Sequence, residues 1–409
     1  MMEEISTHTI WTLLLGLTVI ASGLIEAGFT RLRIPALVGY LLLGLLLRFI
    51  DSRWGILDPP TRNAVQFLAD IGVVALLFRV GLQSHPGALA RKLPQAMKIW
   101  LGDVSGSALL GFVTSYYLLE FALIPSLIIA TALTATSVGV SVAAWQSRHA
   151  IDSDNGRLLV DVAELDDISA VALMALLFVL IPTLHDAKTG VVSTLAATGA
   201  SFAAKFVLFI AGCYLFSRYV EPWLTHFTAH REPKPQRMLT VIGVGFVIAA
   251  LANWLGFSLA IGALFAGLVF SRDPKAIQTE KSFIDIYAFV TPFFFINIGL
   301  GVNPGQIVAG TGLGLILLLA AAAGKFIGAG TPALITSGAT GAVLIGISMI
   351  PRAEITMIVI HQAQRLGNWA LPQEIYAGIV FVSLSTCIIA PLILYRLLQR
   401  WPQTDQEKI

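Results

Sequence analysis

The chain has 409 residues, of which 56% are hydrophobic and only 12% are charged. Soluble globular domains carry roughly 25% charged residues, so this composition excludes a soluble protein. The net charge of +2 sums over loops on both sides of a membrane, and no basic cluster indicates a nucleic acid partner. Apolar runs roughly 20 residues long recur along the whole chain, and each can cross a hydrocarbon core of roughly 30 Å.

Hydrophobic patterning predicts an all-α integral membrane protein of about thirteen transmembrane helices. The predicted helices cover about 8–28, 34–50, 64–82, 98–119, 121–145, 157–182, 196–217, 238–255, 257–271, 283–301, 308–336, 341–362 and 373–398. The start of the chain, Met1-Met2-Glu3-Glu4, is acidic where a secretory signal would be basic, so we expect the first helix to be retained. The polar stretch 221–237 is expected to be a cytoplasmic linker.

The basic residues predict the orientation, because cytoplasmic loops collect Lys and Arg. With the N-terminus outside and the C-terminus cytoplasmic, most of the 26 basic residues fall in inner segments. The outer segments then hold Arg48, Arg53, Arg62, Lys188 and Arg365. This bias fits an odd number of helices.

The helices form two groups of six on either side of the helix at 196–217. Groups displaced by seven helices run in opposite directions, so we predict two inverted repeats joined by a linker helix, as in many transporters. Both groups contain a helix-breaking segment about halfway along an apolar run. The fifth helix carries Thr134, Thr136 and Ser137, and the twelfth carries Pro351. The two predicted discontinuous helices would cross at mid-membrane, although simple kinks could explain either one alone.

Carboxylates lie deep in the sixth predicted helix. Asp166 and Asp167 are ten residues into it, about 15 Å from its end at 1.5 Å per residue. Intramembrane carboxylates are rare unless they serve an ion or proton path. Adjacent positions point about 100° apart, so one aspartate can face a cavity while the other forms an ion pair. Competition between protons and a cation for such a site is sufficient for exchange, and a pair of frozen salt bridges is the alternative.

Other charged residues complete the predicted site. Lys325, in the eleventh helix, needs an anion, for which Asp166 or Asp167 is the natural partner; it is also a candidate second proton carrier, and snorkelling is the alternative. Arg352 and Glu354 are expected to neutralise half-helix ends, as structural groups or as part of the ion path.

Further charged residues lie at other positions in the predicted helices. Glu164 could line a cytoplasmic funnel or face water. We expect Asp161 and Asp103 to be satisfied near a membrane interface, and Arg79 and Lys205 to be anchors. Cys213 and Cys387 lie inside apolar runs, which predicts neither a disulfide nor a metal cluster.

Five short motifs occur in a specific order. They are Thr134-Ala-Thr136-Ser137-Val-Gly139, Glu164-Leu-Asp166-Asp167, Phe293-Phe-Phe-Ile-Asn-Ile-Gly299-Leu300, Gly324-Lys325-Phe326-Ile327-Gly328 and Pro351-Arg352-Ala353-Glu354. Over essentially the whole chain this order resembles the cation:proton antiporter-2 family, and most of all its bacterial sodium/proton antiporters with two adjacent aspartates. One departure is Ala353, where many relatives carry glycine.

The resemblance implies a homodimer with interface helices in 1–95 and 238–304, a transporting core in 96–183 and 305–409, and a linker helix and loop in 184–237. It implies that Asp167 binds the ion and the proton, that Asp166 pairs with Lys325, and that Arg352 and Glu354 form the charged pair of the second broken helix. It also implies electrogenic exchange of two protons for one sodium ion.

The predicted function is therefore exchange of sodium or lithium for protons by alternating access, in a bacterial inner membrane. Sodium, protons and lipid are the expected partners, and we expect no cofactor, no enzymatic activity and no nucleotide-binding regulatory domain. A potassium/proton antiporter is the nearest alternative, followed by a sodium-coupled symporter of an organic anion. A membrane-embedded enzyme is disfavoured because no nucleophile and base pair is evident in the sequence.

Overall fold

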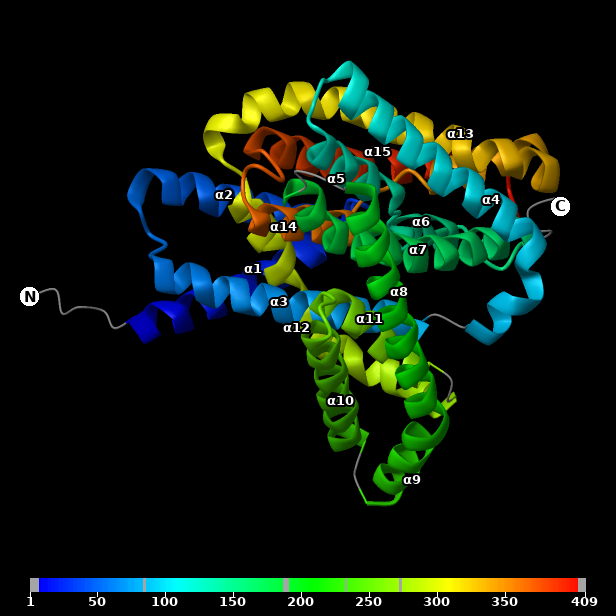
Figure 1. Cartoon of the computed structure of the whole chain (residues 1–409), viewed down its shortest axis with the longest axis horizontal. Coiled ribbons are helices and arrows are strands. Elements are labelled where there is room, and N and C mark those ends of the chain that lie inside the picture. The colour runs from blue at the N-terminus through cyan, green and yellow to red at the C-terminus, as the bar shows by residue number, and fades with distance from the viewer. Residues whose placement is uncertain (1–6, 84–85, 187–190, 232–233, 272–273, 404–409) are drawn as a thin grey trace, which may run out of the picture. The chain divides into compact units, whose positions relative to one another are not determined.

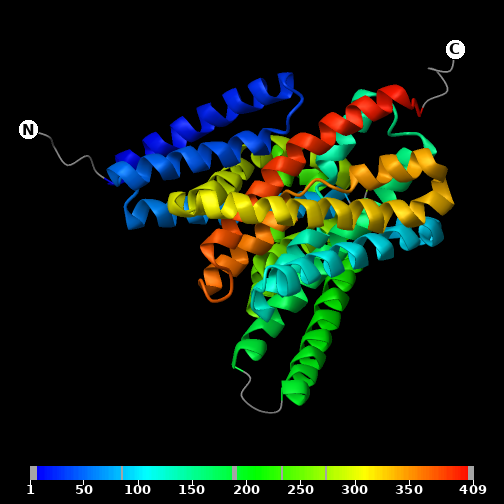
Figure 2. The ribbon, with the colours of Figure 1, turned by 90° about the horizontal axis from the view of Figure 1, so that it is seen from above.

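The computed structural model describes residues 7–83, 86–186, 191–231, 234–271 and 274–403, and these residues form helices joined by turns and short extended segments, with no strand among them (Figures 1 and 2). The α-helices are α1 (Thr7–Arg31), α2 (Ala36–Trp54), α3 (Pro59–Gln83), α4 (Pro86–Val113), α5 (Leu123–Thr134), α6 (Val138–Ser147), α7 (Asp154–Asp186), α8 (Val191–Leu215), α9 (Glu221–Arg231), α10 (Lys234–Trp254), α11 (Leu259–Phe270), α12 (Pro274–Gly301), α13 (Ile307–Ser348), α14 (Glu354–Leu366) and α15 (Gln373–Arg400). The prediction of an all-α protein is confirmed.

Many of these helices are suited to a membrane. Within the described parts of the chain, seven helical segments are long and apolar enough to span a bilayer, and α10 and α11 are shorter apolar helices. Each predicted helix overlaps an observed one. The chain is a multi-pass membrane protein, and the number of thirteen spans remains a prediction.

Two local features add detail to the sequence prediction. The segment expected to be a cytoplasmic linker contains α9, in which Trp223 and Phe227 stack one turn apart with ring centroids 5.5 Å apart. Pro222 is compatible with this helix because it stands in the first turn. The predicted boundary between 336 and 341 is present inside α13, because the backbone at Gly338 (φ 67°, ψ −177°) is not helical and favours a residue without a side chain.

The chain divides into two compact units. The larger comprises Met1–Phe67, Lys92–Ala170 and Phe295–Ile409, and the smaller comprises Leu68–Arg91 and Val171–Phe294. In the smaller unit, α10 packs on α11, and α11 crosses α3 where Gly81 meets Gly267. Phe78, Phe270 and Phe283 fill the core beside this crossing.

In the larger unit, glycines bring helix backbones together. α4 and α13 lie side by side (Figures 1 and 2), and Gly102 and Gly106 of α4 face Gly324 and Gly328 of α13. Gly44 of α2 meets Gly299 of α12 in the same way. Small residues allow this approach in membranes, where association depends on close packing rather than on the hydrophobic effect.

Both predicted helix breaks are present, and they hydrogen-bond to each other. The first separates α5 from α6, and the second separates α13 from α14. Ser137 N donates to Pro351 O (2.8 Å), Thr136 Oγ1 donates to Met349 O (3.2 Å) and Thr356 Oγ1 donates to Ala132 O (2.9 Å). Each break therefore supplies the partners that backbone groups of the other would lack in lipid.

Replacing Gly328 by Ala should destabilise the protein by about 1–3 kcal/mol through overpacking. A Cβ at Gly328 would lie 2.6 Å from Gly102 O, so α4 and α13 would have to move apart. Gly312→Ala is the matched control, because it adds the same group to α13 with no atom within 4 Å. Thermal unfolding in detergent should separate the two variants, and equal melting temperatures would contradict the importance of this contact.

Thr356→Val should cost about 1–3 kcal/mol, because it keeps the shape of the side chain but removes the donor to Ala132 O. Thr291→Val is its control. Thr291 is also buried in a helix, and its hydroxyl has no hydrogen-bond partner among the described residues. The same unfolding assay should show a loss for Thr356→Val only; a comparable loss for both would mean that the crossing contact contributes nothing specific.

Candidate ion site

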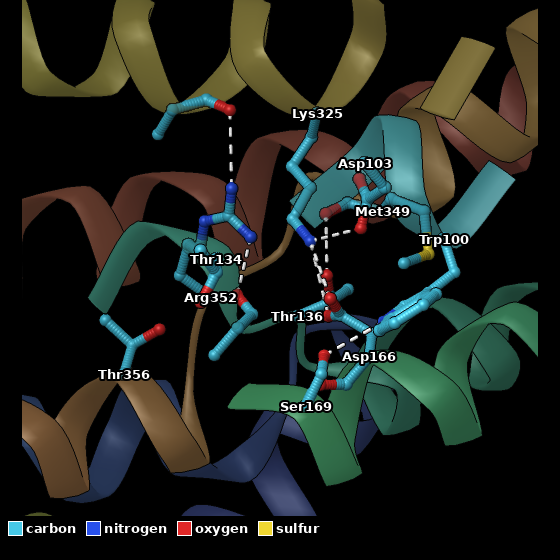
Figure 3. Close-up of polar contacts among 12 residues, drawn as sticks. Trp100, Asp103, Thr134, Thr136, Asp166, Ser169, Lys325, Met349, Arg352 and Thr356 are labelled. Atoms are coloured by element: carbon cyan, nitrogen blue, oxygen red, sulfur yellow. Dashed lines mark hydrogen bonds and ion pairs between the residues drawn. The ribbon is translucent and has the colours of Figure 1, made fainter. Parts of the chain in front are cut away.

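A buried ammonium group lies between two carboxylates in the larger unit (Figure 3). Lys325 Nζ on α13 is 2.5 Å from Asp103 Oδ2 on α4 and 3.2 Å from both carboxylate oxygens of Asp166 on α7. All three side chains are 0% exposed. The ammonium group of Lys325 is therefore the counter-ion of two carboxylates, and all three groups are closed off from solvent.

The local sequence explains how the three groups meet. Gly102 and Gly328 lie beside Asp103 and Lys325 and let the α4 and α13 backbones touch, which places the two charged side chains together. Trp100, one turn before Asp103, donates through Nε1 to Ser169 Oγ (2.9 Å), and Ser169 Oγ donates to Asp166 O (2.9 Å). These bonds fix α7 against α4.

The cluster holds unused acceptor capacity. Among the described residues, no donor reaches Asp103 Oδ1 or the hydroxyl of Ser107, which lies one turn further along α4. Burying an ionised carboxylate costs free energy unless the carboxylate is paired and hydrogen-bonded. The ionised form of Asp103 therefore depends on its contact with Lys325.

Asp167 stands apart from this ion pair. Its side chain is partly buried, and in the described part of the chain no hydrogen bond or ion pair is made by its carboxylate. The negative charges that act on it belong to Asp166, Glu354 and Glu164, and the positive charge to Lys325. The two adjacent aspartates thus occupy different environments, with Asp166 paired and Asp167 available to a ligand.

The half-helix ends carry side chains of complementary sign. Arg352 Nη1 donates to Ala135 O (2.5 Å), just beyond the C-terminus of α5, and Nη2 donates to Ala321 O (3.4 Å). Glu354 begins α14, and its Oε2 accepts a 2.6 Å hydrogen bond from Ser137 Oγ at the N-cap of α6. The positive charge of Arg352 thus lies at the negative C-terminal end of α5. The negative charge of Glu354 lies at the positive N-terminal ends of α6 and α14.

The other predicted site residues lie around these groups. Thr134 Oγ1 donates to Thr131 O (2.8 Å) within the last turn of α5, Thr136 is bonded to Met349 O, and Pro351 O accepts from Ser137 N. Glu164 is partly buried on α7, close enough to act on Asp167. Cys387 is buried and free, and its thiol donates to Arg352 O (3.2 Å).

The prediction for Asp103 was wrong. It was expected near a membrane interface, but it is fully buried against Lys325. Two Gly-x-x-x-Gly pairs, Gly102 with Gly106 and Gly324 with Gly328, flank Asp103 and Lys325 and could have indicated that their helices touch. Snorkelling of Lys325 is excluded by the same contact. Arg79, expected to be an anchor, lies over the ring of Tyr287, 4.4 Å from its centroid.

In the described residues, no group of three or more His, Cys, Asp or Glu side chains is arranged to hold a metal ion. Asp166 and Asp167 are the groups that could hold a transported cation, since their oxygens suit hard cations and lie beside the interrupted helices. Residues with this arrangement can bind and release small ions.

Known proteins resemble the chain in both sequence and fold. It is 26% identical over 337 residues to the high-affinity Na(+)/H(+) antiporter NhaS3 of Synechocystis sp., covering 80% of this chain and 70% of that protein. It is 26% identical over 366 residues to a Na(+)/H(+) antiporter of Enterococcus hirae, covering 89% and 92%. The structure matches the sodium proton antiporter MjNhaP1 of Methanocaldococcus jannaschii with a TM-score of 0.66 at 16% identity, over 96% of this chain and 97% of that chain.

A family model described as "Sodium/hydrogen exchanger, transmembrane" matches residues 16–400. This match covers nearly all the described helices and includes every residue of the buried cluster. The family consists of transporters and not of enzymes, and the chain is a member of the sodium/hydrogen exchanger family.

Proposed function

We propose that the protein exchanges sodium, or lithium, for protons by alternating access, and that the exchange is electrogenic. The observation that carries this proposal is the contrast between two adjacent carboxylates: Asp166 is held by Lys325, whereas Asp167 has no hydrogen-bond partner among the described residues. Such a pair offers one site that either a cation or protons can occupy.

In the proposed cycle, Asp167 is the main binding group and Asp166 assists it. A bound sodium ion or bound protons reduce the negative charge of the site, so a loaded core can move while an empty, doubly ionised one pays a larger desolvation cost. This difference suppresses leak. With two protons exchanged for one sodium ion, one charge crosses per cycle, worth about 2.3 kcal/mol per 100 mV.

Asp103 gives the cycle a feature that the family resemblance did not include. When Asp166 turns from Lys325 toward a cation, the ammonium would otherwise be left unpaired in a dry interior, at a cost of about 3–5 kcal/mol. Asp103 Oδ2 lies 2.5 Å from Lys325 Nζ and would keep the lysine paired while Asp166 moves. We therefore assign Asp103 as the fixed partner and Asp166 as the exchangeable one.

Pairs of equivalent contacts support the inverted repeats. In that arrangement α2 corresponds to α11, and α3 corresponds to α12. The close approach of α2 to α12 at Gly44 and Gly299 then has its counterpart in the approach of α3 to α11 at Gly81 and Gly267. The break after α5 likewise corresponds to the break before α14.

The architecture proposed for transport follows from these repeats. Interface helices occupy 1–95 and 238–304, core helices occupy 96–183 and 305–409, and 184–237 links them. The protein acts as a homodimer in a bacterial inner membrane, with the N-terminus outside and the C-terminus cytoplasmic. The asymmetry of basic residues supports this orientation.

The closest alternative to sodium/proton exchange is potassium/proton exchange. Cation choice depends on cavity size and the number of ligands, so a potassium/proton antiporter could use the same two aspartates. A sodium-coupled symporter of an organic anion would share the broken helices, but it would not need Lys325 between two carboxylates. We favour sodium because the family match and both antiporter relatives are described as acting on sodium or Na(+).

Proton flux in proteoliposomes should respond to sodium or lithium and not to potassium, and an imposed membrane potential should change its rate. Asp167→Asn should abolish the flux, because the amide can neither release a proton nor carry the charge that balances sodium. Asp161→Asn, on the same helix, is the control and should retain exchange. Sodium-dependent flux that survives Asp167→Asn would defeat the assignment, and a response to potassium alone would favour the alternative exchanger.

Asp103→Asn should weaken sodium transport without eliminating it. Lys325 would then have Asp166 as its sole carboxylate partner. A cation that binds Asp166 would have to take this partner away from the lysine. We expect the sodium KM to rise about tenfold or more, as a loss of about 1.4 kcal/mol or more would produce. A control, Ser107→Ala, removes a neighbouring hydroxyl that has no partner among the described residues and should leave the KM unchanged. An unchanged KM in Asp103→Asn would show that Asp103 is not the fixed partner.

A further inference from the structure

The larger unit contains a polar cavity of about 450 Å³ that shares no residue with the buried cluster. It is lined by parts of α2, α3, α12, α14 and α15 and by the turn after α12. Its lining includes Arg48, Asp51, Arg62, Gln66, Asn297 and His361. In the proposed orientation these helix ends lie on the outer side of the membrane, and the exchange cycle described above does not use them.

His361 lies in the wall of this cavity at a junction of three helices. It is only 6% exposed and stands on α14, two turns after Glu354. Its Nε2 is 2.9 Å from Gln66 Nε2 on α3, and Asn297 Nδ2 on α12 donates to Gln66 Oε1 (3.2 Å). Gln66 and Asn297 belong to the proposed interface segments, whereas His361 belongs to the proposed core.

The hydrogen bonds of Gln66 indicate which form of the imidazole fits this arrangement. Because Gln66 Oε1 accepts from Asn297, the group that Gln66 presents to His361 is its NH₂, which can only donate. His361 Nε2 must then accept, so the ring is neutral. An imidazolium has no free lone pair, and it would lose this bond unless the amides of Gln66 and Asn297 both turned over.

The charged side chains that line the cavity also disfavour a positive charge on His361. Arg48 and Asp51 come from α2 and Arg62 comes from α3, while α12, α14 and α15 line the cavity with the uncharged Asn297, Gln364 and Gln373. Glu354 and Arg365 of α14 and Glu374 of α15 are not among the lining residues.

Asp51 is the one carboxylate in the lining, and it is already engaged. Its Oδ2 accepts from Arg62 (2.7 Å) and Arg48 (3.3 Å), and its Oδ1 accepts from Leu57 N (2.7 Å). A charged His361 would therefore add to the two positive charges of Arg48 and Arg62 in the lining of this cavity.

We propose that His361 is a second proton-binding site, at which protons from the outer side release α14 from α3 and α12 and so open the outer cavity. The inference rests on the proposed function and its orientation. Its direction suits an exchanger that takes up external protons, because an acidic exterior would open the side from which those protons enter.

Labelling of a cysteine in the cavity tests the proposal. Val65, which lines the cavity, is changed to Cys in the full-length protein, and a membrane-impermeant maleimide is added to the outer side of proteoliposomes. The parent chain, with Cys213 and Cys387 alone, gives the background. The labelling rate, divided at each pH by the rate in the same protein carrying His361→Gln, should rise severalfold as the outer pH falls from about 8 to about 5, the range in which histidine changes charge. The division cancels the pH dependence of the thiol itself.

Two further variants separate titration from loss of a contact. His361→Arg places a permanent charge at this position and should give fast labelling at every pH. Gln364→Met removes a different bond between α14 and the end of α12, from Gln364 Nε2 to Gly301 O (3.3 Å), with no titratable group. It should therefore keep the acid-induced rise.

A ratio that does not change with pH overturns the proposal, as does slow labelling of His361→Arg at every pH. Labelling from the opposite side alone overturns it together with the proposed orientation. Sodium-dependent proton flux, measured on the same vesicles, is decided separately: if the flux is present and the ratio is flat, only the role of His361 fails.

Discussion

One buried ammonium group governs the arrangement of the site. Lys325 is fully enclosed and lies between Asp103 and Asp166, so it decides which carboxylates in the interior are balanced. An unpaired charge in such a place costs several kcal/mol, far more than a typical hydrogen bond contributes. The glycine contacts between α4 and α13 serve the same constraint, because Lys325 could not reach Asp103 if side chains held these helices further apart.

The two broken helices solve a related problem with partial charges. An interrupted helix exposes carbonyl and amide groups that lipid cannot satisfy. Here the two breaks supply one another with donors and acceptors, while Arg352 and Glu354 oppose the helix ends with the correct sign. Asp167 is left beside this neutralised crossing as a carboxylate without a partner among the described residues, which is the condition that reversible binding of an ion requires.

The sequence predicted the helices and part of the site for reasons that local patterns contain. Apolar runs locate helices, and Asp166 and Lys325 were recognisable because charges inside apolar runs need partners. Asp103 was misplaced because its helix was predicted to start at 98, which put it near an end; α4 begins at Pro86, so Asp103 lies deep. Contacts such as Gln66 with His361, 295 residues apart, leave no local pattern to read.

The short helix α14 links His361, the proposed second proton-binding site, to the crossing of the broken helices. Glu354 at its first turn bonds to Ser137 at the crossing, and His361, two turns later, faces Gln66 in the cavity. Because α14 is a continuous helix of 13 residues that follows a break, we expect it to move as one rod while the backbone angles at Ala353 change. We therefore expect a change of charge at His361 to shift Glu354, whose negative charge acts on Asp167, and so to affect the proposed ion site.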